Sequence, residues 1–213
     1  MLGGRATLNY TIPPGFTVYP SINHYDFDQA KAKQLLKDAG WDFNRSFKLL
    51  SLSDDPNFTV IAPVVQQALQ QIGMKVDLIA EPDAQFIKDE FDPTKFDALF
   101  SFGGSEGVNW SRSEDYTDCS GKSTLGNTLF FLDDAQCKLY KPLYDKAKAL
   151  AAGPEQDKIL EQLALALNDN LPEIYLWQPN YLHVYTDRLG GGFAIYPNER
   201  ESFQVVETWT FAP

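Results

Sequence analysis

Residues 47–79 read FKLLSLSDDPNFTVIAPVVQQALQQIGMKVDLI, and this segment carries the clearest signal for the fold class. Phe47–Leu52 is a short apolar run typical of a buried strand, and Asp54–Pro56 ends it. Apolar residues then recur at helical spacing over Val60–Ile72, before a second strand-like run at Lys75–Ile79. A strand, a helix and a strand of these lengths predict two parallel strands joined by a crossover helix, which is the basic unit of an α/β fold.

The chain on either side of this unit predicts further helices and strands. We expect helices from Asp28 to Gly40, Asp83–Glu90, Lys141–Ala152 and Pro154–Asn170, and strands at Asp97–Phe102, Glu173–Trp177 and Tyr181–Thr186. The resulting prediction is an α/β fold with a mixed β-sheet flanked by helices over residues 26–189. Residues 1–25 and 190–213 are rich in glycine and proline or lack periodicity, so we expect them to form extended arms.

Length and charge exclude several classes of protein. The 213 residues are enough to bury a core, and no apolar run approaches the ~18 residues of a membrane-spanning helix. The first twenty residues lack the basic, apolar and small-residue order of a secretory signal. With 18 Lys and Arg against 29 Asp and Glu, the net charge is −11, which argues against nucleic-acid and anionic-membrane partners.

The two cysteines, Cys119 and Cys137, lie eighteen positions apart and enclose a polar segment. Such a pair suits a disulfide in an oxidising compartment, although two reduced thiols remain an alternative at this point. A metal site is disfavoured, because the chain has no CxxC pair and its two histidines, His24 and His183, are far apart in sequence. We predict no metal and no cofactor, since Walker, GxGxxG and HExxH motifs are also absent from the sequence.

Residues 103–134 form an unusually long segment rich in Gly, Ser, Asn, Asp and Thr, and loops of this length are usually functional or disordered. It begins with GGSEG, which fits the G-x-S-x-G motif of an α/β-hydrolase, with Ser105 as nucleophile and His183 as base. A nucleophile elbow leads directly into a helix, however, and Val108–Thr117 has no apolar helical face. A serine hydrolase is therefore kept as the alternative function, and a structural or interaction module without a small ligand as a third.

The order of several segments resembles one family of proteins. The chain is similar to the dipeptide-, oligopeptide- and nickel-binding class of bacterial extracellular solute-binding proteins, family 5, the receptors of ABC importers. The similar segments are GGRAT (3–7), PPG (13–15), YDFDQAKAKQLLKDAGW (25–41), FKLL (47–50), VVQQALQQIGMKVDL (64–78), KFDALFSFGG (95–104) and LPEIYLW (171–177).

The resemblance covers essentially the whole chain but only part of a family member. It implies one lobe of a periplasmic-binding-protein-like fold of class II (cluster C). Residues 1–25 would then be an inter-lobe arm, residues 26–189 the ligand-binding lobe, and residues 190–213 the return segment toward a missing first lobe. We accordingly expect Met1 to begin a domain excised from a longer protein.

The resemblance also implies a binding function and its site. Family members hold a solute in a cleft between two lobes and deliver it to a membrane permease, so the protein is expected to be periplasmic or extracellular, lipid-anchored or secreted, and not an enzyme. The cleft edge of this lobe is implied to comprise Phe102, Gly103, Gly104, Ser105, Glu106, Asn109 and Trp110. Similar cysteine pairs in dipeptide-binding relatives favour a disulfide between Cys119 and Cys137.

The sequence departs from the family pattern at two places in this segment. Peptide-binding relatives commonly have tryptophan where Phe102 stands, and an aspartate that pairs with the peptide amino group where Val108 and Asn109 stand. Glu106 is the nearest carboxylate that could take over that pairing. The solute is therefore expected to be a peptide or another small molecule.

Overall fold

The structure is a computed structural model that describes residue 23, residues 25–100, 133–172, 174, 176, 186–191 and 209–211. The described residues belong to two compact units. Residues 25–100 and residue 133 form the first, which we call the sheet unit. Residue 23 and the described residues from 134 onward form the second, which we call the helix-pair unit.

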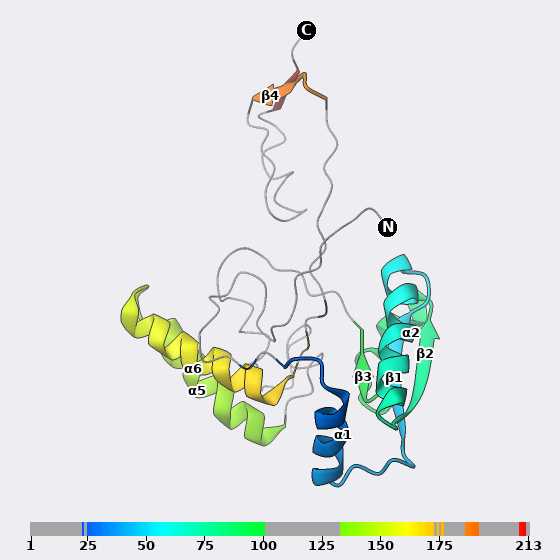
Figure 1. Cartoon of the computed structure of the whole chain (residues 1–213). Coiled ribbons are helices and arrows are strands. Elements are labelled where there is room, and N and C mark those ends of the chain that lie inside the picture. Colours follow the sequence, from blue (N-terminus) through cyan, green and yellow to red (C-terminus); the bar gives the residue numbers. More distant parts are fainter. Residues whose placement is uncertain are drawn as a thin grey trace. The chain divides into compact units, whose positions relative to one another are not determined.

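The sheet unit contains three parallel strands in the order β2-β1-β3 (Figure 1). Their bounds are Ser46–Leu52 for β1, Lys75–Glu81 for β2 and Ala98–Leu99 for β3. The predicted parallel pair with a crossover helix is thus confirmed, with α2, Pro56–Gln71, between β1 and β2. β2 extends two residues beyond its predicted end. β3 begins one residue later than predicted, and its predicted end at Phe102 lies outside the described residues.

The strand register assigns opposite faces of this sheet to different helices. Leu50 of β1 pairs with Ile79 and Leu99, and all three pack around a buried cluster with Phe86 of α3, Asp83–Asp89. Residues on the opposite face include Leu49 and Val76, which are also buried, and α2 contacts β1 and β2. The two helices therefore cover the sheet from its two faces, because neighbouring residues of a strand point in opposite directions.

The helix predicted after Asp28 is confirmed as α1, Gln29–Asp38. The Asp28 carboxylate accepts a hydrogen bond from the Lys31 amide at 2.9 Å, and Gly40 adopts a φ of +71° that favours glycine and ends the helix. None of the residues of α1 is buried, and Leu35 is 58% exposed.

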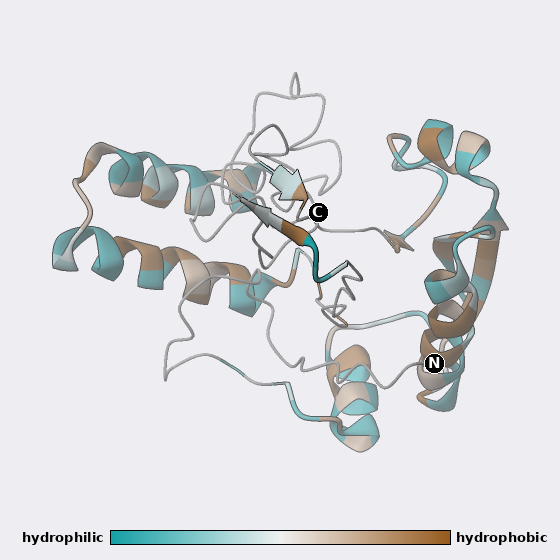
Figure 2. Ribbon diagram, turned by 90° about the horizontal axis from the view of Figure 1, so that it is seen from above, coloured by the Kyte–Doolittle hydropathy of each residue, from teal (hydrophilic) through white to brown (hydrophobic). Residues whose placement is uncertain are grey.

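The helix-pair unit is built on two helices that lie side by side, α5, Asp134–Ala149, and α6, Pro154–Asn170 (Figure 1). The prediction for α6 is confirmed. The predicted range Lys141–Ala152 for α5 is wrong at both ends: Pro142 lies inside the helix, and buried Tyr140 extends the packed face into an earlier turn. Both helices alternate hydrophilic and hydrophobic residues along their turns (Figure 2).

Two buried side chains with amide groups stabilise the helix-pair unit. Gln156 Nε2 donates to the carbonyls of Ala147 at 3.0 Å and Leu150 at 3.1 Å, and so satisfies the C-terminal end of α5. Asn168, which is 0% exposed, accepts from the Asn23 amide at 2.8 Å and donates to the Asn23 carbonyl at 3.1 Å. Asn168 thereby fixes the main chain of Asn23, which lies 145 positions earlier in the sequence.

The C-terminal part of the chain contributes an antiparallel pair of short strands. β4, Leu189–Gly191, pairs with β5, Trp209–Phe211, in the register Gly190↔Thr210. The strand predicted at Glu173–Trp177 is wrong for Ile174 and Leu176, which are exposed and lie outside any strand of the described residues. Most of the strand predicted at Tyr181–Thr186 lies outside the described residues.

Candidate functional site at the carboxyl edge of the sheet

The three parallel strands of the sheet unit end at one edge. β1, β2 and β3 end at Leu52, Glu81 and Leu99. Ligands of open α/β sheets bind outside the carboxyl ends of the strands, because the loops that follow the strands gather there. This edge is therefore the candidate functional site, and the segment implied by sequence to bind ligand follows β3 directly.

Phe100 fixes the point at which the chain leaves β3. Its amide donates to the Leu50 carbonyl at 2.9 Å, and its side chain is only 6% exposed. Its ring lies 5.8 Å from the ring of Phe58, with an angle of 36° between the two planes. Phe58 belongs to the first turn of α2, so the exit from β3 is packed against the helix that begins at the same edge.

The two aspartates after β1 have structural roles. Asp55 is the N-cap of α2, accepting hydrogen bonds from the amides of Asn57 at 2.8 Å and Phe58 at 3.2 Å. The Asp54 carboxylate accepts from the Asp83 amide at 3.1 and 3.3 Å, and so joins the loop after β1 to the start of α3. Asp55 thus begins α2, and Asp54 holds the loop after β1, so neither carboxylate is left free for a ligand.

Glu81, the last residue of β2, is the titratable group at this edge with a shifted pKa. Burial, followed by the negative charge of Asp89 and a hydrogen bond with it, raises the pKa of Glu81 above its ordinary value, while Lys95 acts in the opposite direction. Its Oε2 is buried and has no hydrogen-bond partner among the described residues. The prediction missed this residue because it ended β2 at Ile79, two positions before Glu81.

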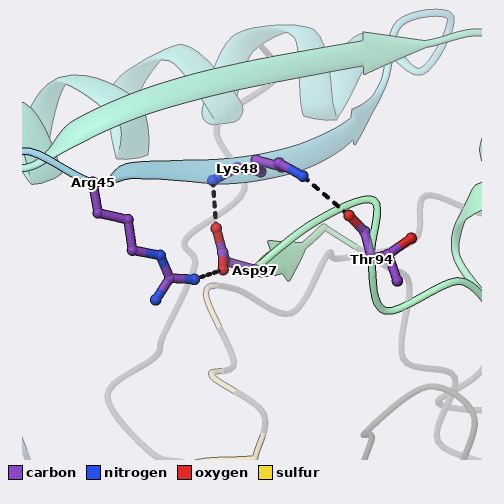
Figure 3. Close-up of polar contacts among 4 residues, drawn as sticks. All are labelled: Arg45, Lys48, Thr94 and Asp97. Carbon is purple, nitrogen blue, oxygen red and sulfur yellow. Dashed lines mark hydrogen bonds and ion pairs between the residues drawn. The ribbon is translucent and has the colours of Figure 1, made fainter.

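A second group of polar contacts lies where the strands begin (Figure 3). Asp97 forms an ion pair with Arg45 and accepts from the Lys48 amide at 2.8 Å. Lys48 Nζ donates to the Thr94 carbonyl at 3.0 Å. Sequence reasoning assigned no role to Asp97, because its partners Arg45 and Lys48 lie 52 and 49 residues earlier in the chain.

The ligand-binding residues implied by the sequence lie outside the described residues: Phe102, Gly103, Gly104, Ser105, Glu106, Asn109 and Trp110. Cys119, His24 and His183 also lie outside them, whereas Cys137 is part of α5. The structure brings together β3, Phe100 and the loops after β1 and β2 at the edge from which this segment continues.

Two features are absent from the described parts of the chain. Among those residues, His, Cys, Asp and Glu form no group of three or more that could hold a metal ion. None of the helices there is both long and apolar enough to cross a membrane.

Comparison with known proteins identifies similar sequences. The profile described as "Bacterial extracellular solute-binding proteins, family 5 Middle" matches residues 1–123. A dipeptide-binding protein of Pseudomonas aeruginosa is 25% identical over 211 residues, which cover 94% of this chain and 37% of that protein. The oligopeptide-binding protein AppA of Bacillus subtilis is 25% identical over 205 residues, covering 88% of this chain and 36% of AppA.

Comparison with solved structures identifies the same fold. The structure of AppA from Bacillus subtilis in complex with a nonapeptide matches 99% of this chain and 43% of its own chain, with a TM-score of 0.72 and 20% identity. The chain thus spans little more than a third of the length of the curated relatives it matches. The expected α/β fold is confirmed, and none of these matches supports the hydrolase alternative.

Proposed function

The chain belongs to family 5 of the bacterial extracellular solute-binding proteins, and on this premise we propose that it supplies one ligand-binding lobe of an ABC-importer receptor. The profile match over residues 1–123 carries this proposal. The parallel sheet supports it, because its carboxyl edge is where an α/β lobe meets a ligand. In the whole protein, this lobe would close on a solute together with a second lobe and present the solute to a permease.

The proposed domain organisation follows the sequence analysis. Residues 1–25 form an arm between lobes, residues 26–189 the ligand-binding lobe, and residues 190–213 a return segment toward the other lobe. The described residues of the lobe include the parallel sheet with α2 and α3, and also the pair of helices α5 and α6. The whole protein acts outside the cytoplasmic membrane, in the periplasm or extracellularly, as family 5 receptors do.

The ligand-binding residues of the lobe are proposed to follow β3 at the carboxyl edge of the sheet. Phe100 leaves the sheet from a buried position against Phe58, and Phe102, Gly103 and Gly104 follow within four residues. Glycines allow a ligand to approach the main chain closely, so main-chain amides there can donate to ligand carbonyl and carboxylate groups. Further along, Ser105, Glu106 and Asn109 supply polar side chains, and Trp110 supplies a ring for stacking.

The proposed solute is a peptide. The relatives named above bind dipeptides or oligopeptides, and the net charge of −11 suits the positively charged amino end of a peptide better than an anionic solute. Glu106 is proposed to pair with that amino group. A charge-assisted hydrogen bond of this kind is about twice as strong as a neutral one, so it supplies both affinity and direction.

Calorimetric titration with tetraalanine and with N-acetyl-tetraalanine tests this proposal. Both peptides offer the same main chain, and only the first carries a charged amino group. We expect tetraalanine to bind about tenfold more tightly, and Glu106→Gln to remove that difference. Asp169→Asn, which changes an exposed carboxylate in the last turn of α6, is the matched control and should leave both affinities unchanged.

Two results would contradict the proposal at different levels. Equal binding of the two peptides by the unmodified chain would exclude amine recognition by Glu106. Absence of saturable heat with di-, tri- and tetraalanine would contradict peptide binding by this lobe.

A further inference from the structure

β3 is the shortest strand of the sheet, yet the proposed binding segment starts from it. Its two residues pair with Leu49 and Leu50 of β1. A strand this short has few hydrogen bonds to its neighbour that could define its register. The register determines which of its side chains lie on each face of the sheet. Contacts outside the ladder must therefore hold β3 in place.

The packing on either side of β3 requires a change of direction in the chain. Phe96 belongs to the cluster around Leu50 and Phe86, whereas Phe100 packs against Phe58 of α2 on the opposite face. In an uninterrupted strand, Phe96 and Phe100 would point to the same face, since they are four residues apart. The chain bends at Asp97, between these two anchors.

Asp97 is bonded to β1 on both its main chain and its side chain (Figure 3). Its amide donates to the Lys48 carbonyl at 2.9 Å, and its Oδ2 accepts from the Lys48 amide at 2.8 Å. Its Oδ1 forms the ion pair with Arg45, whose guanidinium carbon lies 5.2 Å from the ring centre of Trp41. The Asp97 side chain is 20% exposed and that of Arg45 is 52% exposed, so water screens the ion pair in part.

We propose that Asp97 is a positioning residue that fixes the register of β3 and thereby the position of Phe100, from which the chain continues to the proposed binding residues 102–110. A slip of one residue at β3 would exchange the faces of Leu99 and Phe100. The inference rests on the proposed function only for its last step, from the position of Phe100 to ligand binding.

Residue-resolved hydrogen exchange of the whole chain tests the proposal without a ligand. Asp97→Ala should increase the exchange rate of the Phe100 amide, which bonds to Leu50, about tenfold, as expected for loss of a hydrogen bond to a charged group. The exchange rate of the Ser53 amide, which bonds to the Glu81 carbonyl between β1 and β2, should change less than twofold. Asp97→Asn keeps an acceptor for the Lys48 amide and should give an intermediate effect.

Asp77→Ala is the matched control. Asp77 accepts a hydrogen bond from Ser46 Oγ and so links β2 to β1 at the same end of the sheet as Asp97 links β3. The Asp77→Ala substitution should leave the exchange rate of the Phe100 amide unchanged. An equal increase at Phe100 and Ser53 in Asp97→Ala would indicate general loss of stability and overturn the proposal, as would no increase at Phe100. If Asp97→Ala fails to fold, the exchange rates of the Phe100 and Ser53 amides are compared in Asp97→Asn and Arg45→Met instead.

The peptide titration separates this inference from the proposed function. If tetraalanine binds, Asp97→Ala should weaken its affinity about tenfold and Asp77→Ala should not. If tetraalanine does not bind the unmodified chain but the Phe100 amide responds as expected, Asp97 still fixes β3 and the proposed peptide function is wrong. If tetraalanine binds equally to both variants, the position of β3 does not control the binding segment and the proposal is refuted.

Discussion

Replacing Asn168 with alanine should destabilise the helix-pair unit by about 2–3 kcal/mol. Asn168 is fully buried in α6, and its amide group makes two hydrogen bonds to the main chain of Asn23, at 2.8 and 3.1 Å. Each bond contributes about 0.5–1.5 kcal/mol net, and a main-chain group left without its partner adds a desolvation cost. The smaller side chain also leaves a cavity at this fully buried position.

Urea-induced unfolding followed by circular dichroism measures this loss, with Asn170→Ala as the control. Asn170 lies two residues further along α6, is exposed, and donates to the Ala166 carbonyl at 2.8 Å within the same helix. The Asn170→Ala substitution should lower the free energy of unfolding by less than about 0.5 kcal/mol, since surface substitutions have small effects. Hydrogen exchange at the Asn23 amide should rise in Asn168→Ala and not in the control.

Asn168→Asp sharpens the test, because it keeps the shape of the side chain but puts a carboxylate beside the Asn23 carbonyl. Burial and this carbonyl should raise the pKa of the new carboxyl group. The stability that its protonated form provides is present at low pH and is lost as the pH rises through the raised pKa, so the variant should be less stable at pH 7 than at pH 4 relative to the unmodified chain. Equal stabilities of Asn168→Ala and Asn170→Ala would refute the reasoning.

Three further predictions concern ionisation and covalent chemistry. Because the pKa of Glu81 is raised, the stability that its protonated form provides is present below its ordinary pKa and is lost as the pH rises through the raised value. Glu81→Gln should therefore be more stable than the unmodified chain at pH 7, with no gain at pH 4. Lower stability of the variant at pH 7, measured by urea unfolding, would contradict this. Thiol titration of the denatured, unreduced protein should find almost no free thiol if Cys119 and Cys137 form the predicted disulfide, and two thiols per chain would exclude it. A fluorophosphonate probe should leave Ser105 unlabelled, and stoichiometric labelling would favour the hydrolase over the solute receptor.

Local sequence signals were sufficient to predict the sheet unit. The apolar run of β1 and the helical spacing in α2 each act within a few neighbouring residues, and the structure confirms the elements they predict. The φ of +99° at Gly73 explains why a glycine ends that helix. Boundaries that depend on tertiary packing were less accurate, as at α5, where buried Tyr140 extends the helix to the other side of Pro142.

The candidate site was predictable only in part, because its described contacts join residues distant in sequence. The cap at Asp55 follows from its neighbours, but the bond from the Asp83 amide to Asp54 spans 29 residues. At the opposite edge of the sheet, the ion pair of Arg45 with Asp97 spans 52 residues. A single sequence carries no local signal for such pairs. The ligand-binding role of residues 102–110 came from family resemblance and remains a prediction.

Amide chemical-shift mapping during titration with tetraalanine tests most directly whether the carboxyl edge of the sheet is the ligand-binding edge. One lobe can bury only part of the roughly 70–90% of ligand surface that a complete pocket covers, so we expect a dissociation constant weaker than about 1 µM. Saturable shifts should appear at residues 102–110, at Phe100 and in the loops after β1 and β2, while the amides of α6 stay unchanged. Saturable shifts confined to α5 and α6, or no saturable shift at residues 100–110, would contradict the account.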